Sequence, residues 1–508
     1  MEHYSPNKKE FLSLAKKGNL IPVYREILAD LETPVSAFLK AGDEPYSYLL
    51  ESVEGGEKIA RYSFIGGAPS LVFKSKGRSI TLLESDDKAP RPVKRTFETD
   101  KDPFYELERV LSRFRQAPVK GLPPFSGGAV GYLTYDTVRF IERIPDKNRD
   151  AQAIPDALFI FTDTIFIFDH LNKKIKVVSN VFLDKFKKKE EAYDYAVQKI
   201  DQEIKRLRSL PGRSGSFGAA GPAGSPGSES IRFDSNFKRS GFERAVLAAK
   251  RHIKKGDIIQ VVLSQAFRAK VRCHPFDIYR ALRSINPSPY MFYLNCGEFQ
   301  LVGSSPEIHV RCEDRKATLR PIAGTRHRGA DAREDAALEK DLLNDPKERA
   351  EHLMLVDLGR NDLGRVCEYR SIAVPEFMTV ERYSHVMHLV SHVEGRLRRD
   401  QTPFDLLRAT FPAGTVSGAP KVRAMEIIDE LENERRGFYS GIVGYFSYSR
   451  NFDSCITIRT VLVKDGVATV QAGAGIVADS KPPKEYQETV NKAKALMKAV
   501  EEAERGFQ

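Results

Sequence analysis

The sequence predicts an α+β protein with many β-strands in both halves of the chain. Short runs rich in β-branched and aromatic residues, which are typical of strands, alternate with segments of helical character. No short-period repeat is present. At 508 residues the chain is too long for one ordinary hydrophobic core, and roughly two to four domains are expected.

The first part of the chain, residues 1–210, is expected to hold mostly strands and two helices. The second helix, at about 184–209, is rich in lysine and has apolar residues at helical spacing. The other expected helix spans 104–114, and the expected strands span 46–52, 79–83, 127–133, 158–168 and 174–179.

Residues 211–229 differ from the rest of the chain in composition. They consist mainly of Gly, Ser, Pro and Ala, which cannot build a core and are typical of a flexible linker. We therefore expect a boundary here, between an N-terminal part and a C-terminal part over 230–508.

The C-terminal part is expected to mix helices and strands more evenly. The expected strands include 257–267 and 290–294. The expected helices span 240–255, where Gly256 ends the helix, then 275–285, about 331–358 and 484–505. This pattern continues the α+β architecture of the first part.

The cysteines and the apolar runs exclude several classes of protein. The five cysteines are scattered without a C-x-x-C pair, which argues against structural zinc or a disulfide framework and favours a reducing cytoplasm. The N-terminus is too polar for a signal peptide. No stretch approaches the ~20 apolar residues of a membrane span; residues 157–168 come nearest, but they carry Asp163.

The net charge of +11 permits nucleic-acid binding. However, the basic residues are mostly interleaved with acids, and no basic motif studded with aromatic residues is present. A small anionic substrate or a solvated surface explains the excess charge equally well. We expect neither a nucleic acid nor a membrane as partner.

Residues 320–329 read RPIAGTRHRG, a polar segment with an alanine near its centre. The guanidinium groups of Arg320, Arg326 and Arg328, the Thr325 hydroxyl and the flanking glycines suit a bound carboxylate or phosphate. An exposed basic turn has the same composition, so both interpretations remain open at this point. If the segment is a site, Ala323 provides no nucleophile.

Two predicted helices carry acids one turn apart. Glu348 and Glu351 share one face of the first helix, and Glu485 and Glu488 share one face of the last. Clustered carboxylates suit Mg²⁺, which takes one or two of them together with water and substrate oxygens. Acids on helices are more often simply solvated, so this pattern alone does not establish a metal site.

Two glycine-rich loops argue against nucleotide cofactors. QAGAGI at 471–476 follows a strand and could turn its amides onto a carboxylate, but it lacks the third glycine of a dinucleotide-binding loop. FPAGTVSGAPK at 411–421 lacks the spacing of a P-loop, so ATP is not expected.

Three histidines lie close together at His385, His388 and His392. On a helix they would share one face and suggest zinc. The β-branched, apolar residues around them favour a strand, which would place His388 and His392 on one face and His385 on the other. A single functional histidine is therefore the preferred interpretation.

Six motifs follow one another in the C-terminal part: GSSPE at 303–307, RPIAGT at 320–325, AEHLMLVD at 350–357, VMHLV at 386–390, GTVSGAPK at 414–421 and QAGAGI at 471–476. In this order they resemble the chorismate-utilising enzymes, and within that family the aminase branch that makes anthranilate. The resemblance covers roughly 235–498 and extends more weakly over 48–52 and 60–66. It implies two large facing β-sheets flanked by helices, with an N-terminal regulatory domain over 1–210 and a chorismate-binding catalytic domain over 230–508.

The resemblance also implies how the substrate is bound. Mg²⁺ would lie between the ring carboxylate of chorismate and the pair Glu351 and Glu488, with Glu348 and Glu485 beside them. The Arg459 fork would hold the second carboxylate, on the enolpyruvyl arm. The remaining substrate-binding residues implied are Gly324, Thr325, Tyr445, Gly473, Ala474, Gly475 and Lys492.

The implied reaction adds ammonia to the ring, expels a hydroxyl group and then eliminates pyruvate. Hydroxide needs a proton to leave, and Glu307 is the candidate general acid if its pKa is raised. Thr415 would contact the same hydroxyl, and His388 would assist the elimination by moving or orienting a proton.

Two positions distinguish the branches of the family. Isochorismate-forming members carry a lysine base where this chain has Gln260, and many aminodeoxychorismate synthases carry a nucleophilic lysine where it has Ala323. Without either lysine, direct attack by free ammonia remains. An aminodeoxychorismate synthase of the folate pathway stays as the alternative, because alanine at 323 does not exclude it.

The resemblance further implies a partner and an inhibitor. No cysteine lies in a G-x-C-x-G sequence, so a separate glutamine amidotransferase subunit is expected to supply ammonia. Tryptophan is expected to inhibit by binding in the N-terminal part, in a pocket formed by Glu51, Ser52, Pro289, Tyr290 and Met291. A simple packing contact between strands is the alternative for these residues.

Overall fold

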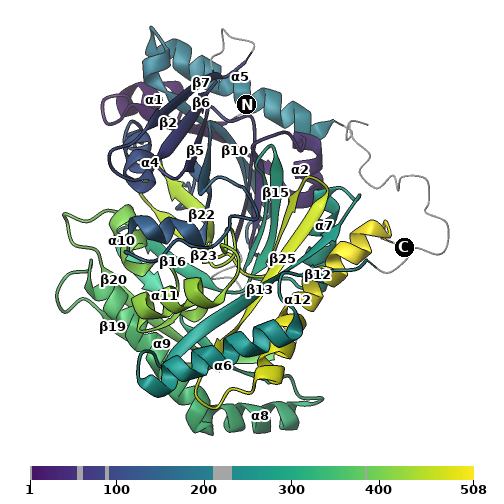
Figure 1. Ribbon diagram of the computed structural model, residues 1–508. Helices are drawn as coiled ribbons and strands as arrows, with labels where there is room; N and C mark the ends of the chain where they lie inside the picture. Colours follow the sequence, from purple (N-terminus) through teal and green to yellow (C-terminus); the bar gives the residue numbers. More distant parts are fainter. Residues whose placement is uncertain (1–2, 54–60, 86–90, 210–230, 384–385, 508) are drawn as a thin grey trace.

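The computed structural model describes residues 3–53, 61–85, 91–209, 231–383 and 386–507. The segment 211–229 and His385 lie outside the described residues. Two large antiparallel sheets with helices packed around them confirm the predicted α+β class (Figure 1).

The first sheet, here called sheet A, has thirteen strands among the described residues. It includes a two-residue strand, β21 (Gly418–Ala419), which pairs with β13. The other strands run in the order β1 (Tyr4–Ser5), β2 (Leu20–Leu28), β11 (Lys174–Phe182), β10 (Thr164–Asp169), β4 (Tyr62–Gly66), β3 (Ser47–Glu51), β14 (Tyr290–Asn295), β15 (Phe299–Ser305), β24 (Thr460–Lys464), β25 (Val467–Ile476), β13 (Gln260–Lys270) and β12 (Asp234–Ser235).

The second sheet, sheet B, has twelve strands in the described part of the chain. One of them, β19 (Ala373–Arg382), pairs with β20. The others run in the order β18 (Ile322–His327), β20 (Val386–Arg396), β17 (Lys316–Leu319), β16 (Ile308–Glu313), β23 (Phe452–Ile456), β22 (Ile442–Ser447), β8 (Gly128–Leu133), β9 (Ala157–Thr162), β5 (Leu71–Lys76), β6 (Ser79–Glu84) and β7 (Val93–Glu98).

Both sheets contain strands from both sides of segment 211–229. In sheet A, β3 pairs with β14, so that Glu51 lies opposite Met291. In sheet B, β8 pairs with β22, so that Val130 lies opposite Tyr445. The two stretches of chain are thus joined by continuous backbone hydrogen bonding.

Helices cover the outer faces and the ends of the sheets. Helix α6 (Arg239–Lys255) and helix α12 (Pro482–Glu504) lie side by side across β13 and β25 (Figure 1). The remaining helices are α1 (Lys8–Leu14), α2 (Pro34–Ala41), α4 (Pro103–Leu111), α5 (Lys189–Arg208), α7 (Pro275–Ile285), α8 (Ala332–Asn344), α9 (Pro346–Gly364), α10 (Pro403–Thr410) and α11 (Lys421–Leu431), with short 3-10 turns η1 (Tyr135–Phe140), η2 (Leu183–Lys185) and η3 (Gly414–Val416). No helix in the described part of the chain is long and apolar enough to cross a membrane.

Two expected elements are each divided in the structure. The strand expected over 158–168 is two strands, β9 and β10, that separate at Asp163. The helix expected over 331–358 is two helices, because Pro346 cannot continue a helix and begins α9 instead. The Asp345 side chain caps α9 by accepting the amide hydrogens of Lys347 and Glu348.

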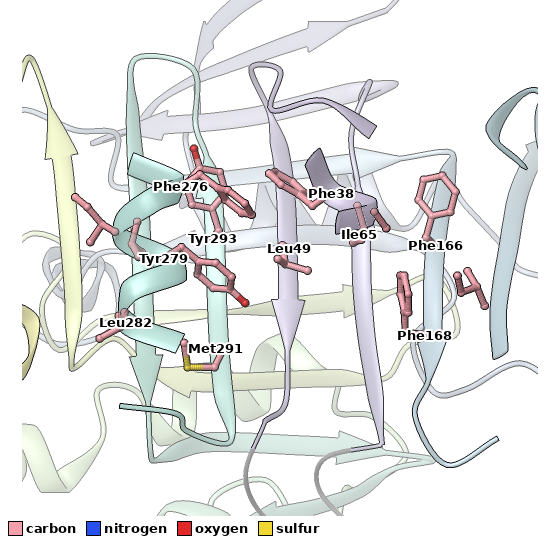
Figure 2. Packing of buried hydrophobic residues seen from close by; sticks show 14 of the residues in the cluster. Phe38, Leu49, Ile65, Phe166, Phe168, Phe276, Tyr279, Leu282, Met291 and Tyr293 are labelled. Atoms are coloured by element: carbon pink, nitrogen blue, oxygen red, sulfur yellow. The ribbon is translucent and has the colours of Figure 1, made fainter. Parts of the chain in front are cut away.

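Aromatic and aliphatic side chains fill the outer face of sheet A. Phe38 of α2 stacks on Phe276 of α7, with ring centroids 4.8 Å apart, and Tyr293 of β14 packs edge-on against both rings (Figure 2). A second core lies between the sheets, where Ile165 and Phe292 of sheet A meet Val130 of sheet B. Because both cores include strands from both stretches of chain, the helices and sheets form one packed framework for the cavities below.

Candidate active site

The candidate active-site cavity lies where β13 and β25 of sheet A approach β18 and α9. Its volume is about 220 Å³. It is lined by Gln260, Val262, Pro306, Glu307, Ile322, Ala323, Glu351, Leu355, Thr415, Val416, Tyr439, Ile458, Arg459, Gln471, Ala472, Gly473, Gly475 and Lys492. Seven residues that the sequence nominated for substrate, metal or catalysis therefore share one cavity: Glu307, Glu351, Thr415, Arg459, Gly473, Gly475 and Lys492.

Glu307 follows strand β15, and hydrogen bonds to Ile456 fix the position of its backbone. Its carbonyl accepts the amide hydrogen of Ile456 at 3.0 Å, and the Ser305 hydroxyl donates to the Ile456 carbonyl at 2.7 Å. Burial raises the pKa of the Glu307 carboxyl to about 7, and the nearby Thr415 hydroxyl and Lys492 cation only partly oppose this rise. Glu307 can therefore carry a proton near neutral pH, as a general acid requires.

Thr415 lies on η3, opposite Glu307. Its hydroxyl is buried and makes no hydrogen bond of good geometry among the described residues, although it lies close enough to the Glu307 carboxyl to lower that group's pKa. A buried hydroxyl without a partner is costly, so a ligand in the cavity would complete its hydrogen bonding.

Arg459 forms the cationic end of the cavity. Its guanidinium donates to the Lys492 carbonyl at 3.1 Å and has no carboxylate partner in the described structure. Burial lowers its pKa, which reflects the cost of a charged group that lacks a counter-ion. A bound carboxylate would remove this cost.

Strand β25 offers backbone amides near Arg459. Strand β24 pairs with β25 only as far as Val470, and no other described strand pairs with that edge beyond it. Gly473 and Gly475 therefore line the cavity, whereas the Ala474 side chain packs among hydrophobic residues on the opposite face. Lys492 donates to the Gly473 carbonyl at 3.1 Å and pairs with Glu488 at 2.7 Å.

The acids of α9 and α12 lie at the mouth of the site. Glu351 accepts a hydrogen bond from the Gln260 amide at 3.1 Å. Burial and the charge of Glu351 raise the pKa of Glu348, and burial and the charge of Glu488 raise that of Glu485. Within the described residues no three acids, histidines or cysteines converge on a point, so a cation here would need ligands from water or substrate.

His388 lies on β20, directly opposite Thr325 on β18. Its Nδ1 lies 2.9 Å from the Gly324 carbonyl and 3.0 Å from the Thr325 hydroxyl. Because a carbonyl only accepts, Nδ1 carries the hydrogen and Nε2 keeps its lone pair. Burial lowers the pKa of His388, and the nearby Arg459 lowers it further. His388, Thr325 and Gly324 adjoin the cavity without lining it.

Ala323 and Gln260 both line the active-site cavity. The arginines around Ala323 are occupied by acids: Arg320 pairs with Glu381, Arg326 with Asp341, Asp345 and Glu348, and Arg328 with Asp335. These arginines are therefore not free to bind an anion, and the structure does not support the interpretation of segment 320–329 as an anion site.

Tyr445 does not lie where the sequence placed it. Its side chain lies in a second cavity, stacked on Phe125 with ring centroids 4.3 Å apart. The tyrosine that lines the active-site cavity is Tyr439, just before β22. Its hydroxyl lies so near Gly473 that a Cβ there would come within 2.6 Å of it.

The second cavity, of about 260 Å³, lies between β3 and β14 of sheet A and β22 and β23 of sheet B. All five residues nominated for tryptophan binding line it: Glu51, Ser52, Pro289, Tyr290 and Met291. The Ser52 hydroxyl is buried without a hydrogen-bond partner among the described residues.

Glu51 is already bound at the edge of the second cavity. Arg283 donates to both of its carboxylate oxygens, at 3.0 and 3.2 Å, and Tyr279 donates to one of them. A carboxylate has about four acceptor positions, so one of them remains for an added ammonium group.

The histidine segment forms strand β20, as the sequence favoured. His392 pairs with Glu394 at 3.2 Å, and His388 faces Gly324. No metal cluster is found within the described residues.

A desolvated arginine without a counter-ion, a carboxyl with a raised pKa and acids on two helices define an enzyme site for a small substrate that carries carboxylates. The chain belongs to the family of chorismate binding enzymes, which matches residues 48–498.

Known relatives are similar over almost the whole chain. The sequence is 48% identical to anthranilate synthase component 1 from Acetivibrio thermocellus, covering 98% of this chain and 99% of the relative. It is 50% identical to anthranilate synthase component 1 from Aquifex aeolicus, covering 98% of each.

Solved structures show the same fold. Anthranilate synthase component I from Streptococcus pneumoniae superposes with a TM-score of 0.74 at 36% identity, covering 93% of this chain and 99% of that one. The menaquinone-specific isochorismate synthase MenF from Escherichia coli superposes with a TM-score of 0.67 at 19% identity, covering 99% and 98%, and shows the likeness of fold alone.

Proposed function

We propose that this protein is the aminase subunit of an anthranilate synthase, which converts chorismate and ammonia to anthranilate and pyruvate in the first committed step of tryptophan biosynthesis. One observation carries the proposal. The same cavity holds Arg459, which has no carboxylate partner in the described structure, and Glu307, which can carry a proton near neutral pH. The full-length similarity to anthranilate synthase component 1 supports the same activity.

Substrate binding uses charge at both ends of the cavity. Arg459, the free edge of β25 and Tyr439 would hold the enolpyruvyl carboxylate. Mg²⁺ fits the mutually repelling acids of α9 and α12, with Glu351 and Glu488 as its protein ligands. When bound, it would neutralise the ring carboxylate and draw electron density from the ring.

Glu307 and Thr415 act on the leaving hydroxyl. Ammonia adds to ring carbon C2 while Glu307 protonates the C4 hydroxyl, which leaves as water and gives an aminodeoxyisochorismate intermediate. The unpartnered Thr415 hydroxyl would hold the departing oxygen.

His388 serves the second step, the loss of pyruvate. Gly324 fixes the Nδ1–H tautomer, which leaves Nε2 as the free base in a ring whose pKa is lowered. His388 would move or orient a proton as the ring becomes aromatic.

The missing lysines favour free ammonia as the nucleophile. Ala323 and Gln260 line the cavity, so neither of the two positions carries a lysine that could form a covalent adduct or activate water. A separate glutamine amidotransferase would supply the ammonia. Co-elution with such a subunit on gel filtration is expected, and glutamine-dependent turnover by this chain alone would contradict it.

One assay tests the activity. The purified chain, given chorismate, Mg²⁺ and an ammonium salt at alkaline pH, should form fluorescent anthranilate and pyruvate in equal amounts. Amination without pyruvate release would favour the alternative, aminodeoxychorismate synthase of the folate pathway, and no reaction at all would reject both.

The second cavity would bind tryptophan as a feedback inhibitor. The fourth acceptor position of Glu51 suits the amino group, and the unpartnered Ser52 hydroxyl suits a further polar contact. We expect Ser52→Ala to keep catalysis and to raise the tryptophan concentration needed for half-inhibition. Ser75→Ala is the matched control, because Ser75 also has a buried, unpartnered hydroxyl but does not line this cavity; equal inhibition of both variants would reject the assignment.

The five cysteines carry no disulfide, which fits a protein of the reducing cytoplasm. We place the protein there on this ground and on its proposed biosynthetic role.

A further inference from the structure

A small chamber adjoins the active-site cavity behind Glu307. This side chamber has a volume of about 50 Å³ and shares Glu307, Leu355 and Thr415 with the active-site cavity. Its other lining residues include His309, Asp362, Thr410 and Gly414. A single water needs only about 10–15 Å³ of such space, so the side chamber has room for at least one small molecule.

A β-bulge places His309 in the side chamber. On β16, Ile308 lies opposite Cys455 and Val310 opposite Ser454, so His309 is the extra residue of the strand. Bulges re-aim side chains and are frequent beside active sites. Here the bulge places a histidine two residues after Glu307, with 2% of its surface exposed.

The hydrogen bond that Ser454 donates favours one tautomer of His309. The Ser454 hydroxyl donates its one hydrogen to the Val310 carbonyl at 3.2 Å. With its hydrogen on the Val310 carbonyl, the serine oxygen accepts from His309 Nδ1, which lies 3.1 Å away. Nε2 is then left with a bare lone pair, and it has no hydrogen-bond partner within the described residues.

The charge state of His309 agrees with this geometry. Burial and the nearby Lys421 cation lower the pKa of His309 to about 3, against the opposing effect of the Thr410 carbonyl. The imidazole is therefore neutral at physiological pH and acts as an acceptor. His309 and Thr410, which bring the acceptors Nε2 and a carbonyl oxygen, thus line a chamber that Glu307 also lines.

Every charged group around the side chamber except Glu307 already has a partner. Lys421, at the start of α11, bonds to Asp362 of α9 at 2.7 Å and to the Thr410 carbonyl at 3.2 Å. Arg320 pairs with Glu381. On the cavity side of Glu307, Lys492 of α12 pairs with Glu488, and Glu351 of α9 and Arg459 complete the charged lining.

We propose that the side chamber holds a water molecule, fixed by His309 Nε2 beside the Glu307 carboxyl, that returns a proton to Glu307 in each turnover. The water would donate one hydrogen to Nε2, which otherwise has no partner among the described residues, and the other to Glu307. His309 is then a positioning residue, because it never carries the proton itself. The proposal rests on the proposed function.

The proton balance requires such a return. Glu307 gives one proton to the hydroxyl group, which leaves as water. The attacking ammonia becomes an ammonium group on the ring and must release one proton. Chorismate and ammonia thus give the amine intermediate and water with no net proton change, provided that one proton comes back to Glu307 through the solvent. The held water takes up that proton and passes one of its own to the carboxylate.

The test is the pH profile of kcat, measured at constant free ammonia and saturating chorismate. His309→Leu removes the acceptor and keeps a large side chain at this position. We expect kcat near pH 7 to fall on the order of tenfold. The carboxylate loses a donor, so its pKa rises and the basic limb of the profile should move up by about one pH unit. KM for chorismate and for ammonium should not change.

Ser454→Ala is the second variant, because it changes no group in the side chamber. Without the serine oxygen, the imidazole can place its proton on Nε2 and donate it to the Thr410 carbonyl, so the basic limb should shift in the same direction. His352→Leu is the control: His352 is fully buried and bonded through Nε2 to Ser391 at 2.6 Å, but it does not line the side chamber. Its basic limb should stay at the wild-type position.

An unmoved basic limb in both His309→Leu and Ser454→Ala would overturn the proposal. A raised KM for ammonium with an unmoved limb would also overturn it, since the side chamber would then hold the nucleophile instead of water. The pKa of Glu307 can also be read without turnover, from the carbon-13 titration of its carboxyl group assigned with Glu307→Gln. A failure of the wild-type chain to make anthranilate would reject the proposed function, whereas this titration would still decide the proposal on the water.

Discussion

The buried position of Glu307 suits the proposed chemistry but lowers the stability of the fold above neutral pH. Its folded-state pKa of about 7 lies above the ordinary value of 4.5, so the fold favours the protonated form. The stability that this form contributes is complete below about pH 4.5 and is lost as the pH rises through about 7. Above neutral pH, the folded protein therefore retains a buried carboxylate at a cost in stability.

We predict that Glu307→Gln inactivates and stabilises the protein at once. The amide cannot ionise, so the free energy of unfolding at pH 8.5 should exceed that of the wild type by roughly 1–3 kcal/mol, with little difference at pH 4.5. Urea denaturation at the two pH values measures this change, and kcat should fall at least about 100-fold. Equal stability at pH 8.5 would contradict a raised pKa.

Arg459 gives the second prediction at this scale. Because it is a desolvated guanidinium without a carboxylate partner, Arg459→Gln should not destabilise the fold. KM for chorismate should rise roughly 10- to 100-fold, from the ~1.5–3 kcal/mol of a hydrogen bond to a charged group.

Arg311→Gln is the matched control for Arg459→Gln. Arg311 bonds Asp453 at 2.8 Å in the second cavity, so its loss leaves a buried carboxylate unpaired. This variant should lower the melting temperature and leave KM unchanged. A destabilised Arg459→Gln with normal KM would show that Arg459 has a structural role only.

The sequence nominated seven of the residues that line the active-site cavity, because most of them lie within its recognisable motifs. It failed at Tyr445, since Tyr439 lies just before β22 and Tyr445 within it, and only the tertiary fold shows which cavity each one faces. His309 gave no sequence signal, because the bulge that aims it depends on the register of β16 against β23.

Among the elements, the break between α8 and α9 positions the acids of the site. The signal for it was present in the sequence as Asp345 followed by Pro346, a helix cap followed by a first-turn proline. The helical periodicity on both sides hid this signal. The division of β9 from β10 at Asp163 was hidden in the same way, by apolar residues on either side.

We predict that Asp345→Ala weakens both the fold and the proposed magnesium binding. The change removes the cap of α9 and a partner of Arg326, which should cost about 1 kcal/mol or more. It also loosens the turn that carries Glu348 and Glu351, so the Mg²⁺ concentration for half-maximal activity should rise roughly tenfold. Thermal unfolding and a Mg²⁺ titration of activity measure the two effects.

Asp102→Ala is the control for this prediction. Asp102 also caps a helix, α4, and also bonds an arginine, Arg408, at 2.6 Å, but it lies outside both cavities. It should cost similar stability and leave the Mg²⁺ dependence unchanged. An equal shift in both variants would mean that the effect on Mg²⁺ follows general destabilisation.

Over the whole molecule, the two cavities are joined by shared strands. Strand β23 brings Asp453 and Cys455 to the second cavity and ends at Ile456, whose amide donates to the Glu307 carbonyl. Strand β14 places Tyr290 of the second cavity opposite Ser305, two residues before Glu307. We infer that a ligand that displaces either strand would move Glu307, which gives the proposed tryptophan inhibition a direct route.

The same sharing of strands predicts how the chain behaves when it is cut within 211–229. A protease site placed there should yield two pieces that stay together on gel filtration and unfold within a few degrees of the intact protein, because β3 pairs with β14 and β8 pairs with β22 across the cut. Each piece expressed alone should aggregate, since separation exposes long strand edges and half of each core. If instead each piece were soluble and unfolded cooperatively by itself, the parts before and after 211–229 would be independent domains, and the proposed inhibition would have to pass through an interface between them.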